Sequence, residues 1–217
     1  MIDLHSHTLF SDGGLLLSEL ARRAEVARYR VLNVSDHVDR SNIDFVVPRV
    51  AKAVAELNRL SKIRVIAGAE ITHVPLEQIA PLVREARRLG AQLVTVHGET
   101  LSEPVIPGTN EAAIEAGCDI LAHPGLISEN AAKLAATKGV CLEISGRKGH
   151  CLANGHVARL ARSAGAKLVF GSDAHDEGDL VTKEQAERIL RGAGLGEAEV
   201  RQVWVNAEEL VKKVLSL

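Results

Sequence analysis

The stretch "MIDLHSHTLFSDGGLLLSELARRAEVARYRVLNVSDH" (residues 1–37) contains one complete strand–helix–strand pattern. The short apolar run "MIDLH" comes first. In "LSELARRAEVARY" (17–29), which follows, apolar residues recur three and four positions apart, and this spacing indicates an amphipathic helix. The β-branched run "RVLNVS" (30–35) then predicts a second strand. A strand, a helix and a strand in this order are typical of a βαβ unit in a parallel sheet.

The same alternation continues along the chain. Five further strands are predicted, with helix-period segments such as "PRVAKAVAELNRL" (48–60) between them. These strands are expected at residues 63–70, 91–97, 118–123, 139–145 and 166–173. The strands are apolar almost throughout, as in a parallel sheet covered on both faces. No linker divides the chain, so we expect one α/β domain over residues 1–217, followed near its end by amphipathic helices from about 181.

Composition narrows the range of functions. The chain has 217 residues, of which 46% are hydrophobic, and its formal net charge is -2, which provides no basic surface for long nucleic acids. Aromatic residues are too scarce to stack many bases. The three cysteines form no C-x-x-C pair, and no segment is long and apolar enough to cross a bilayer. We therefore expect a cytoplasmic protein with a small substrate and no membrane partner.

Histidines and carboxylates stand where the predicted strands end. The connections that follow strands, such as 36–48, 98–110 and 145–155, are the long polar ones, and this side of a parallel barrel or sheet carries its site. In a closed or nearly closed barrel, burying these groups without a counter-charge would be very unfavourable. Imidazole and carboxylate are ligands for zinc, manganese and iron. The candidate residues are His5, His7, Asp36, His37, Glu70, His97, His123, Glu143, Asp173 and His175.

The spacing of residues in the first and last predicted strands supports this expectation of a metal site. His5 and His7 are two residues apart on a strand, so both project from the same face and can chelate one ion. Asp173 and His175 in "GSDAH" have the same spacing. Asp12 lies past the first strand in "SDG", where a turn can carry it back toward the same place.

Other polar residues near the strand ends leave alternatives open. Asp36 and His37 are adjacent, so only one is expected to be a direct ligand. His73 is interpreted as a loop residue, while His150 in the loop "SGRKGH" can reach the pocket. Whether Asp36, Glu143 and His150 support ligands or contact substrate is left open by the sequence.

Six motifs together resemble those of the PHP (polymerase and histidinol phosphatase) family. They are "DLHSHTLFSDG" from Asp3, "SDH" at 35–37, "GAE" ending in Glu70, "VHGE" around His97, "AHPG" around His123 and "GSDAH" at 171–175. They occur in the family's order and span most of the chain. The resemblance implies a distorted seven-stranded (β/α)7 TIM-like barrel over about residues 1–180.

The resemblance also implies a centre of two to three divalent ions (Zn, Mn or Fe). A first ion would be held by His5, His7, Glu70 and Asp173; a second by Glu70 as a bridge with His97 and His123; and a third by Asp12, His37 and His175. No ligand of the family pattern is missing. The implied reaction is hydrolysis of a small phosphate ester, as in histidinol phosphatases, by a hydroxide held between two ions.

Three residues are expected to act in catalysis. Asp173 and His175 come from the metal motif, and Asp173 is one candidate for protonating the leaving group. Arg147, beside Lys148 in the loop after the sixth strand, can grip phosphate with its planar fork, although it can equally be a solvated charge.

Three alternatives remain beside a phosphomonoesterase. A nuclease or nucleotide phosphodiesterase would use the same ligands. An amidohydrolase would also begin with H-x-H, but a metal-bridging lysine commonly ends its fourth strand, where this chain has His97. A non-catalytic PHP module would be expected to have lost ligands. The oligomeric state is left open.

Overall fold

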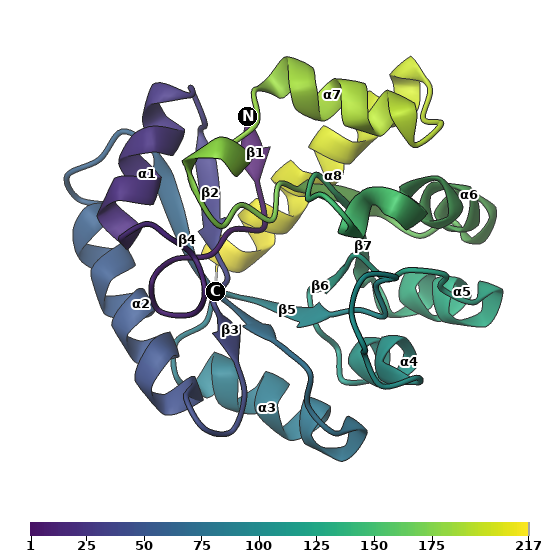
Figure 1. Ribbon diagram of the computed structural model, residues 1–217, viewed down its shortest axis with the longest axis horizontal. Helices are drawn as coiled ribbons and strands as arrows, with labels where there is room; N and C mark the ends of the chain where they lie inside the picture. The colour runs from purple at the N-terminus through teal and green to yellow at the C-terminus, as the bar shows by residue number, and fades with distance from the viewer. Residues whose placement is uncertain (217) are drawn as a thin grey trace.

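Seven strand positions form a parallel sheet that curls into a nearly closed barrel in the computed structural model, which describes residues 1–216 (Figure 1). Neighbouring strands follow the order β1-β2-β4-β5-β6-β7-β8. Their bounds are β1 (Ile2–Asp3), β2 (Val31–Val34), β3 (His37–Val38), β4 (Arg64–Ile71), β5 (Leu93–His97), β6 (Ile120–Ala122), β7 (Cys141–Ser145) and β8 (Leu168–Gly171). The predicted fold class and strand count are confirmed.

The short strand β3 continues the position of β2. β2 pairs with the first half of β4, where Val34 lies opposite Ala67, and β3 pairs with the second half, where His37 lies opposite Glu70. Eight strand segments therefore occupy seven barrel positions. The break between β2 and β3 falls next to the polar residues 35–37, and β3 brings His37 alongside Glu70.

The first and last strands meet at the carboxyl end of the barrel. The Asp173 N–H donates to the His5 carbonyl at 2.9 Å, and the His7 N–H donates to the Ala174 carbonyl at 2.8 Å. An isolated parallel bridge joins Ser6 to Ala174. Residues far apart in the sequence are thereby brought together at the mouth of the barrel.

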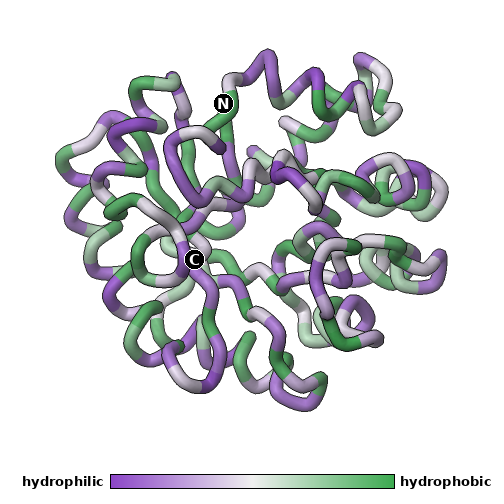
Figure 2. Tube along the Cα trace, in the orientation of Figure 1, coloured by the Kyte–Doolittle hydropathy of each residue, from purple (hydrophilic) through white to green (hydrophobic). Residues whose placement is uncertain are grey.

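Helices cover the outside of the sheet (Figure 1). They are α1 (Leu17–Val26), α2 (Ile43–Leu57), α3 (Leu76–Arg88), α4 (Thr109–Glu115), α5 (Glu129–Lys138), α6 (Asn154–Ala164), α7 (Lys183–Gly192) and α8 (Glu197–Leu215), with 3-10 turns η1 (His150–Ala153) and η2 (Glu177–Asp179). Hydrophilic and hydrophobic residues alternate at short intervals along the helices in Figure 2, as expected of amphipathic helices packed on a barrel. None of the helices within residues 1–216 is long and apolar enough to span a membrane.

Helix α2 begins earlier than its sequence pattern suggested. The predicted segment began at Pro48, whereas the helix starts at Ile43 and contains the proline. Val46 and Val47 are buried before the proline, and Val50 continues the same face beyond it. The apolar stripe that packs on the barrel thus extends through Pro48, and the polar connection is correspondingly shorter than expected.

The C-terminal helix α8 closes the floor of the barrel. Ala207, Leu210, Val211 and Val214 form one buried cluster with residues from the amino-terminal ends of the strands, including Ile2. Earlier along the same helix, Trp204 packs against the main core, with its ring centroid 6.1 Å from that of Phe170. The helix therefore seals the end of the barrel opposite the mouth.

Candidate metal centre

The nine candidate ligands converge at the mouth of the barrel. Six of them are almost completely buried, although every one is titratable: His5, His7, Glu70, His97, His123 and Asp173. The other three, Asp12, His37 and His175, lie nearer the solvent. Five overlapping sets of side chains at this mouth each offer ligand atoms within 4.8 Å of one another. We refer to a first group around His5, His7, Glu70 and Asp173, a second around His97 and His123, and a third around Asp12, His37 and His175.

The first group comes from β1, β4 and the segment after β8. His5 Nε2 lies 3.3 Å from Glu70 Oε2 and 3.8 Å from Asp173 Oδ1. His7 Nε2 lies 3.6 Å and 3.2 Å from the same two oxygens. Four ligands about 2.1 Å from one ion in a tetrahedron stand about 3.4 Å apart, so these separations suit one shared ion.

Glu143 supports this group from behind. Its Oε2 accepts a hydrogen bond from His5 Nδ1 at 2.6 Å, and both side chains are fully buried. This bond fixes the His5 ring so that Nε2 faces the other ligands, the arrangement typical of metal-binding histidines. Gly171 leaves room for the pair, because a Cβ at that position would lie 2.5 Å from the Glu143 carboxylate. Glu143 thus contacts a candidate ligand, His5, and does not itself join the group.

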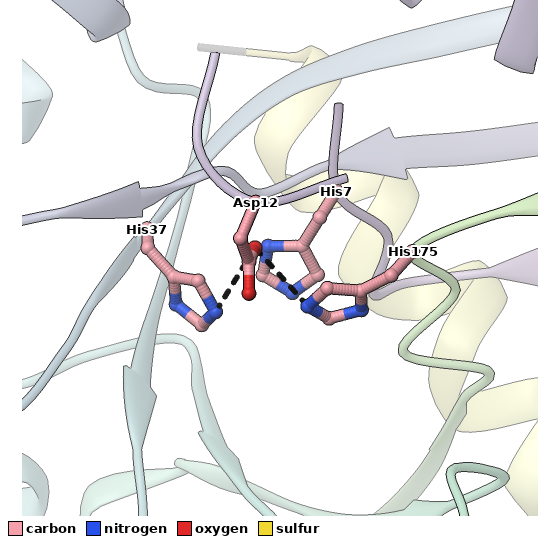
Figure 3. A group of neighbouring side chains, drawn as sticks. All are labelled: His7, Asp12, His37 and His175. Atoms are coloured by element: carbon pink, nitrogen blue, oxygen red, sulfur yellow. Dashed lines mark ion pairs between the residues drawn. The ribbon is translucent and has the colours of Figure 1, made fainter. Parts of the chain in front are cut away.

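The third group, nearest the solvent, surrounds Asp12 (Figure 3). Asp12 Oδ1 lies 3.1 Å from His175 Nε2 and 3.5 Å from His37 Nε2. The His7 ring lies beneath, with its centroid 4.3 Å from that of His37 and 4.2 Å from that of His175. The turn after β1 therefore does carry Asp12 back toward residues from β3 and the segment after β8.

Asp36 holds that turn in place and stays outside the group. Its carboxylate accepts hydrogen bonds from the Thr8 N–H at 2.7 Å, the Thr8 hydroxyl at 2.8 Å and the Ser11 hydroxyl at 2.8 Å. Of the adjacent pair Asp36 and His37, the structure thus places only His37 among the candidate ligands. The positioning of Asp12 depends on the buried carboxylate of Asp36.

The second group lies on the β5–β6 side of the mouth. His97 and His123 are in edge contact, with ring centroids 4.5 Å apart. Glu70 faces both sides, because its Oε1 lies 3.7 Å from His123 Nε2 while its Oε2 faces the first group. The structure adds His150, whose ring stacks on that of His123 at 4.1 Å.

Glu103 also enters this second group, and the sequence reasoning missed it. Its Oε2 lies 3.1 Å from His97 Nε2 and 2.9 Å from His73 Nε2. The neighbouring His97 imidazole, with His73 adding to its effect, lowers the pKa of Glu103 to about 2 despite partial burial. The only feature of the sequence that could have identified Glu103 was an acidic residue in the long connection after β5. Sequence spacing does not predict where the side chain of a loop residue lies.

Two candidate ligands have strained backbones. His123 has φ 26° and Asp173 has φ 56°, in a region that residues other than glycine rarely adopt. Such conformations cost about 1–3 kcal/mol each and cluster at functional sites. The fold holds both side chains toward the mouth at the expense of local stability.

The chemistry of the donor atoms fits divalent cations. Among the described residues, the buried atoms without a hydrogen-bond partner include His5 Nε2, both nitrogens of His7, both oxygens of Glu70 and Nδ1 of His123. Burial, together with neighbouring imidazoles, holds the pKa of His7 and His123 well below the usual range. Both rings are therefore neutral near pH 7 and offer lone pairs to a cation.

Opposite charges dominate at two further buried candidate ligands, His5 and Glu70. Burial alone would lower the pKa of His5, but the carboxylates of Glu143 and Glu70 raise it well above the usual range. Burial alone would raise the pKa of Glu70, yet His5 and His37 hold it well below its usual range. The centre therefore carries negative charge that a cation can neutralise in place of these protons.

Arg147 lies at the edge of the first and third groups. Its Nη1 donates to the Asp173 carbonyl at 3.2 Å and stands 2.8 Å from His175 Nδ1. Its Nε lies 3.9 Å from Asp173 Oδ2. The guanidinium is thus half-buried beside the candidate ligands, as the loop position had suggested, with Asp179 as a further partner at 3.5 Å.

An open cavity of about 430 Å³ adjoins the third group. Asp12 and His37 form one side of it, while Asp39, Asn42 and Glu103 contribute to the rest. The described residues that line it include no lysine or arginine. The candidate ligands therefore border a polar, acidic space large enough for a small molecule.

Solved structures share this fold. Histidinol phosphate phosphatase from Lactococcus lactis, complexed with zinc, L-histidinol and phosphate, has a TM-score of 0.63 at 16% identity, covering 90% of this chain and 94% of that chain. An amidohydrolase has a TM-score of 0.66 at 16% identity, covering 98% and 74% of the two chains. The A. niger ochratoxinase has a TM-score of 0.62 at 16% identity, covering 96% and 70%. At these identities the likeness shows the barrel fold alone.

A relative defines the family. An uncharacterized protein of Methanocaldococcus jannaschii is 40% identical over 215 residues, which are 98% of this chain and 99% of that protein. The chain therefore belongs to the same family as that protein. No protein-family model matches the chain.

Proposed function

We propose that this protein is a metal-dependent phosphomonoesterase of the PHP type. The observation that carries the proposal is the convergence of nine imidazoles and carboxylates, distributed over overlapping sets of possible ligands, at one barrel mouth. The zinc-containing histidinol phosphate phosphatase with the same fold supports it. The resemblance of the motifs to the PHP family, which implies ligands at the same strand ends, also supports it.

Each group would hold one divalent ion through its own residues. The first would use His5, His7, Glu70 and Asp173; the second Glu70, His97 and His123; and the third Asp12, His37 and His175. Glu70 is suited to bridging, because its two oxygens face different groups. Bound ions of this kind would activate water near neutral pH and offset the charge of a phosphoryl group.

Residues around the ions would orient the substrate. Arg147 offers guanidinium N–H groups beside Asp173 and His175, where a phosphoryl oxygen could accept them. Glu143 fixes the His5 ring, and Asp36 fixes the turn that carries Asp12. These contacts hold the site before substrate arrives, so little reorganisation is needed during the reaction.

The adjoining cavity suggests the kind of ester. At about 430 Å³ it suits a small alcohol, and its carboxylate Asp39 favours hydroxyl or amine groups. Because the described lining of this cavity has no lysine or arginine, a second phosphate or a nucleic-acid backbone is not favoured there. A small phosphomonoester, of the type that histidinol phosphatases hydrolyse, fits better than a nuclease substrate.

A substrate panel tests the proposal. Protein purified without chelator should contain two to three transition-metal ions per chain and, with manganese supplied, release phosphate from small phosphomonoesters, histidinol phosphate among them. Nucleotides, short DNA and amide substrates serve as comparisons. His97→Ala should abolish hydrolysis while circular dichroism shows the fold retained. A protein that neither holds nor responds to metal would refute the proposal, and cleavage of DNA or amides alone would reassign it.

A further inference from the structure

We infer that Glu103, carried by the loop between β5 and α4, is a protein ligand of the ion held by His97 and His123. This inference rests on the proposed metal-dependent function. It gives the second ion a carboxylate of its own, in addition to the shared Glu70. The loop thereby becomes part of the metal centre instead of a border of the cavity.

The orientation of His97 is the first argument. Its Nδ1 donates to the Gly98 carbonyl at 3.1 Å, so a neutral ring directs the lone pair of Nε2 away from the backbone. That nitrogen lies 3.1 Å from Glu103 Oε2. A lone pair and a carboxylate oxygen at this distance repel each other unless a cation or a proton lies between them. A separation of 3.1 Å also suits two ligands of one ion.

A second imidazole faces the other oxygen of the same carboxylate. Glu103 Oε1 lies 3.4 Å from His150 Nε2. The opposite nitrogen, His150 Nδ1, is tied to the Thr100 hydroxyl at 2.6 Å and the Ser102 hydroxyl at 3.1 Å. Because His150 also stacks on His123, the Glu103 carboxylate lies at the border of the second group.

The loop is built to hold Glu103 in this position. The Glu99 carboxylate accepts hydrogen bonds from the Gly108 N–H at 3.0 Å and the Asn110 N–H at 2.9 Å, which closes the loop at its base. Gly125 packs so tightly under Glu99 that a Cβ there would collide with the Glu99 carbonyl, and its φ of 58° also favours glycine. The same loop supplies Thr100 and Ser102 to His150, so the two side chains are positioned together.

The simpler alternative to metal binding is that Glu103 only forms an ion pair with His73. That contact is short, at 2.9 Å, but both side chains are more than a third exposed, and exposed pairs stabilise proteins weakly. His97 is only 2% exposed, and the same Glu103 oxygen faces it. Replacing His73 therefore distinguishes the two roles of Glu103, because it removes the ion pair but leaves a metal ligand in place.

Metal binding by Glu103→Gln tests the inference. Zinc is titrated into apo-protein against a chromophoric chelator of comparable affinity, and cobalt is used to report ligand number from its visible spectrum. We expect Glu103→Gln to hold one fewer zinc ion under competition, or to bind one ion at least tenfold more weakly, with a changed cobalt spectrum. His73→Ala keeps Glu103 and should match wild type in both measurements. Circular dichroism checks the fold of each variant.

Two results would overturn the inference. The first is that Glu103→Gln retains every ion with unchanged affinity and spectrum. The second is that His73→Ala reproduces the loss seen in Glu103→Gln, which would identify an ion pair. In either case wild-type protein still binds its ions, and the proposed function stands. Wild-type protein that binds no zinc would instead refute both, and Glu103→Ala provides a second variant in case the glutamine is poorly folded.

Discussion

Replacing Glu143 by Gln should weaken binding of the first ion without disturbing the fold. Glu143 Oε2 accepts the hydrogen bond from His5 Nδ1 at 2.6 Å, and neither side chain is exposed to solvent. Glutamine has nearly the same shape, so the core around Gly171 stays filled. What changes is the charge of the acceptor, which both orients the His5 ring and raises its basicity toward a metal.

The size of the effect follows from this one bond. Hydrogen bonds to charged groups contribute about 1.5–3 kcal/mol, and those between neutral groups about 0.5–1.5 kcal/mol. The difference, about 1–1.5 kcal/mol, corresponds to a five- to tenfold loss of affinity, because about 1.4 kcal/mol is tenfold. Loss of such supporting partners typically costs 10–100-fold in metal affinity. We therefore expect a loss of about tenfold.

Competition for zinc with a chromophoric chelator measures the loss directly. The control is Glu111→Gln, because Glu111 is an exposed residue of α4 that accepts only from the Ser128 hydroxyl at 3.1 Å in the described structure. Circular dichroism should show both variants folded. Zinc affinities of Glu143→Gln and wild type that agree within twofold would refute the role assigned to Glu143.

Three further predictions concern stability. Burial raises the pKa of Asp3 to about 6, from about 3.9 in an unfolded chain, so metal-free native protein loses up to about 3 kcal/mol as the pH rises from 4 to 6. Asp3→Asn has no carboxyl group to titrate, so its free energy of unfolding relative to that of wild type, from denaturant titrations, should increase between about pH 4 and 6. A difference that stays constant over these pH values would contradict the raised pKa of Asp3. Leu210→Ala should cost about 2–5 kcal/mol at the barrel floor, whereas Val205→Ala on the exposed side of α8 should cost under about 0.5 kcal/mol; equal urea midpoints would exclude a floor role. Zinc at 100 times its dissociation constant should stabilise the protein by about 2.7 kcal/mol, and an unchanged melting temperature would argue against a native metal site.

Much of the site could be predicted because it follows from strand order. The carboxyl ends of parallel strands meet at one end of a barrel, so His97 at the end of β5 and His123 after β6 had to become neighbours once the barrel formed. The alternation of strands and helices was readable from apolar spacing, since both patterns are local. The start of α2 was misplaced because a buried stripe continued through Pro48 against the usual preference of proline.

The position of the loop residue Glu103 and the closing of the barrel floor by α8 could not be predicted in this way. Glu103 lies several residues past its strand, and its position depends on Glu99, Gly125 and His150, each from a different part of the fold. The closing of the barrel floor by α8 likewise depends on the ends of several strands at once. Such arrangements arise from packing between distant segments, for which local spacing carries no signal.

The sequence by itself determined the parallel α/β arrangement, the end of the strands that carries the candidate site and the candidate ligands, because these depend on periodicity and on the face from which a side chain projects. The barrel was implied by the resemblance to the PHP family. Only the tertiary structure decided how the candidate ligands lie relative to one another. Glu70 faces two groups, Asp36 supports the turn of Asp12, and the loop after β5 brings Glu103 to His97. These relations are set by separations of 3–4 Å between segments far apart in the chain, which only the closed barrel brings together.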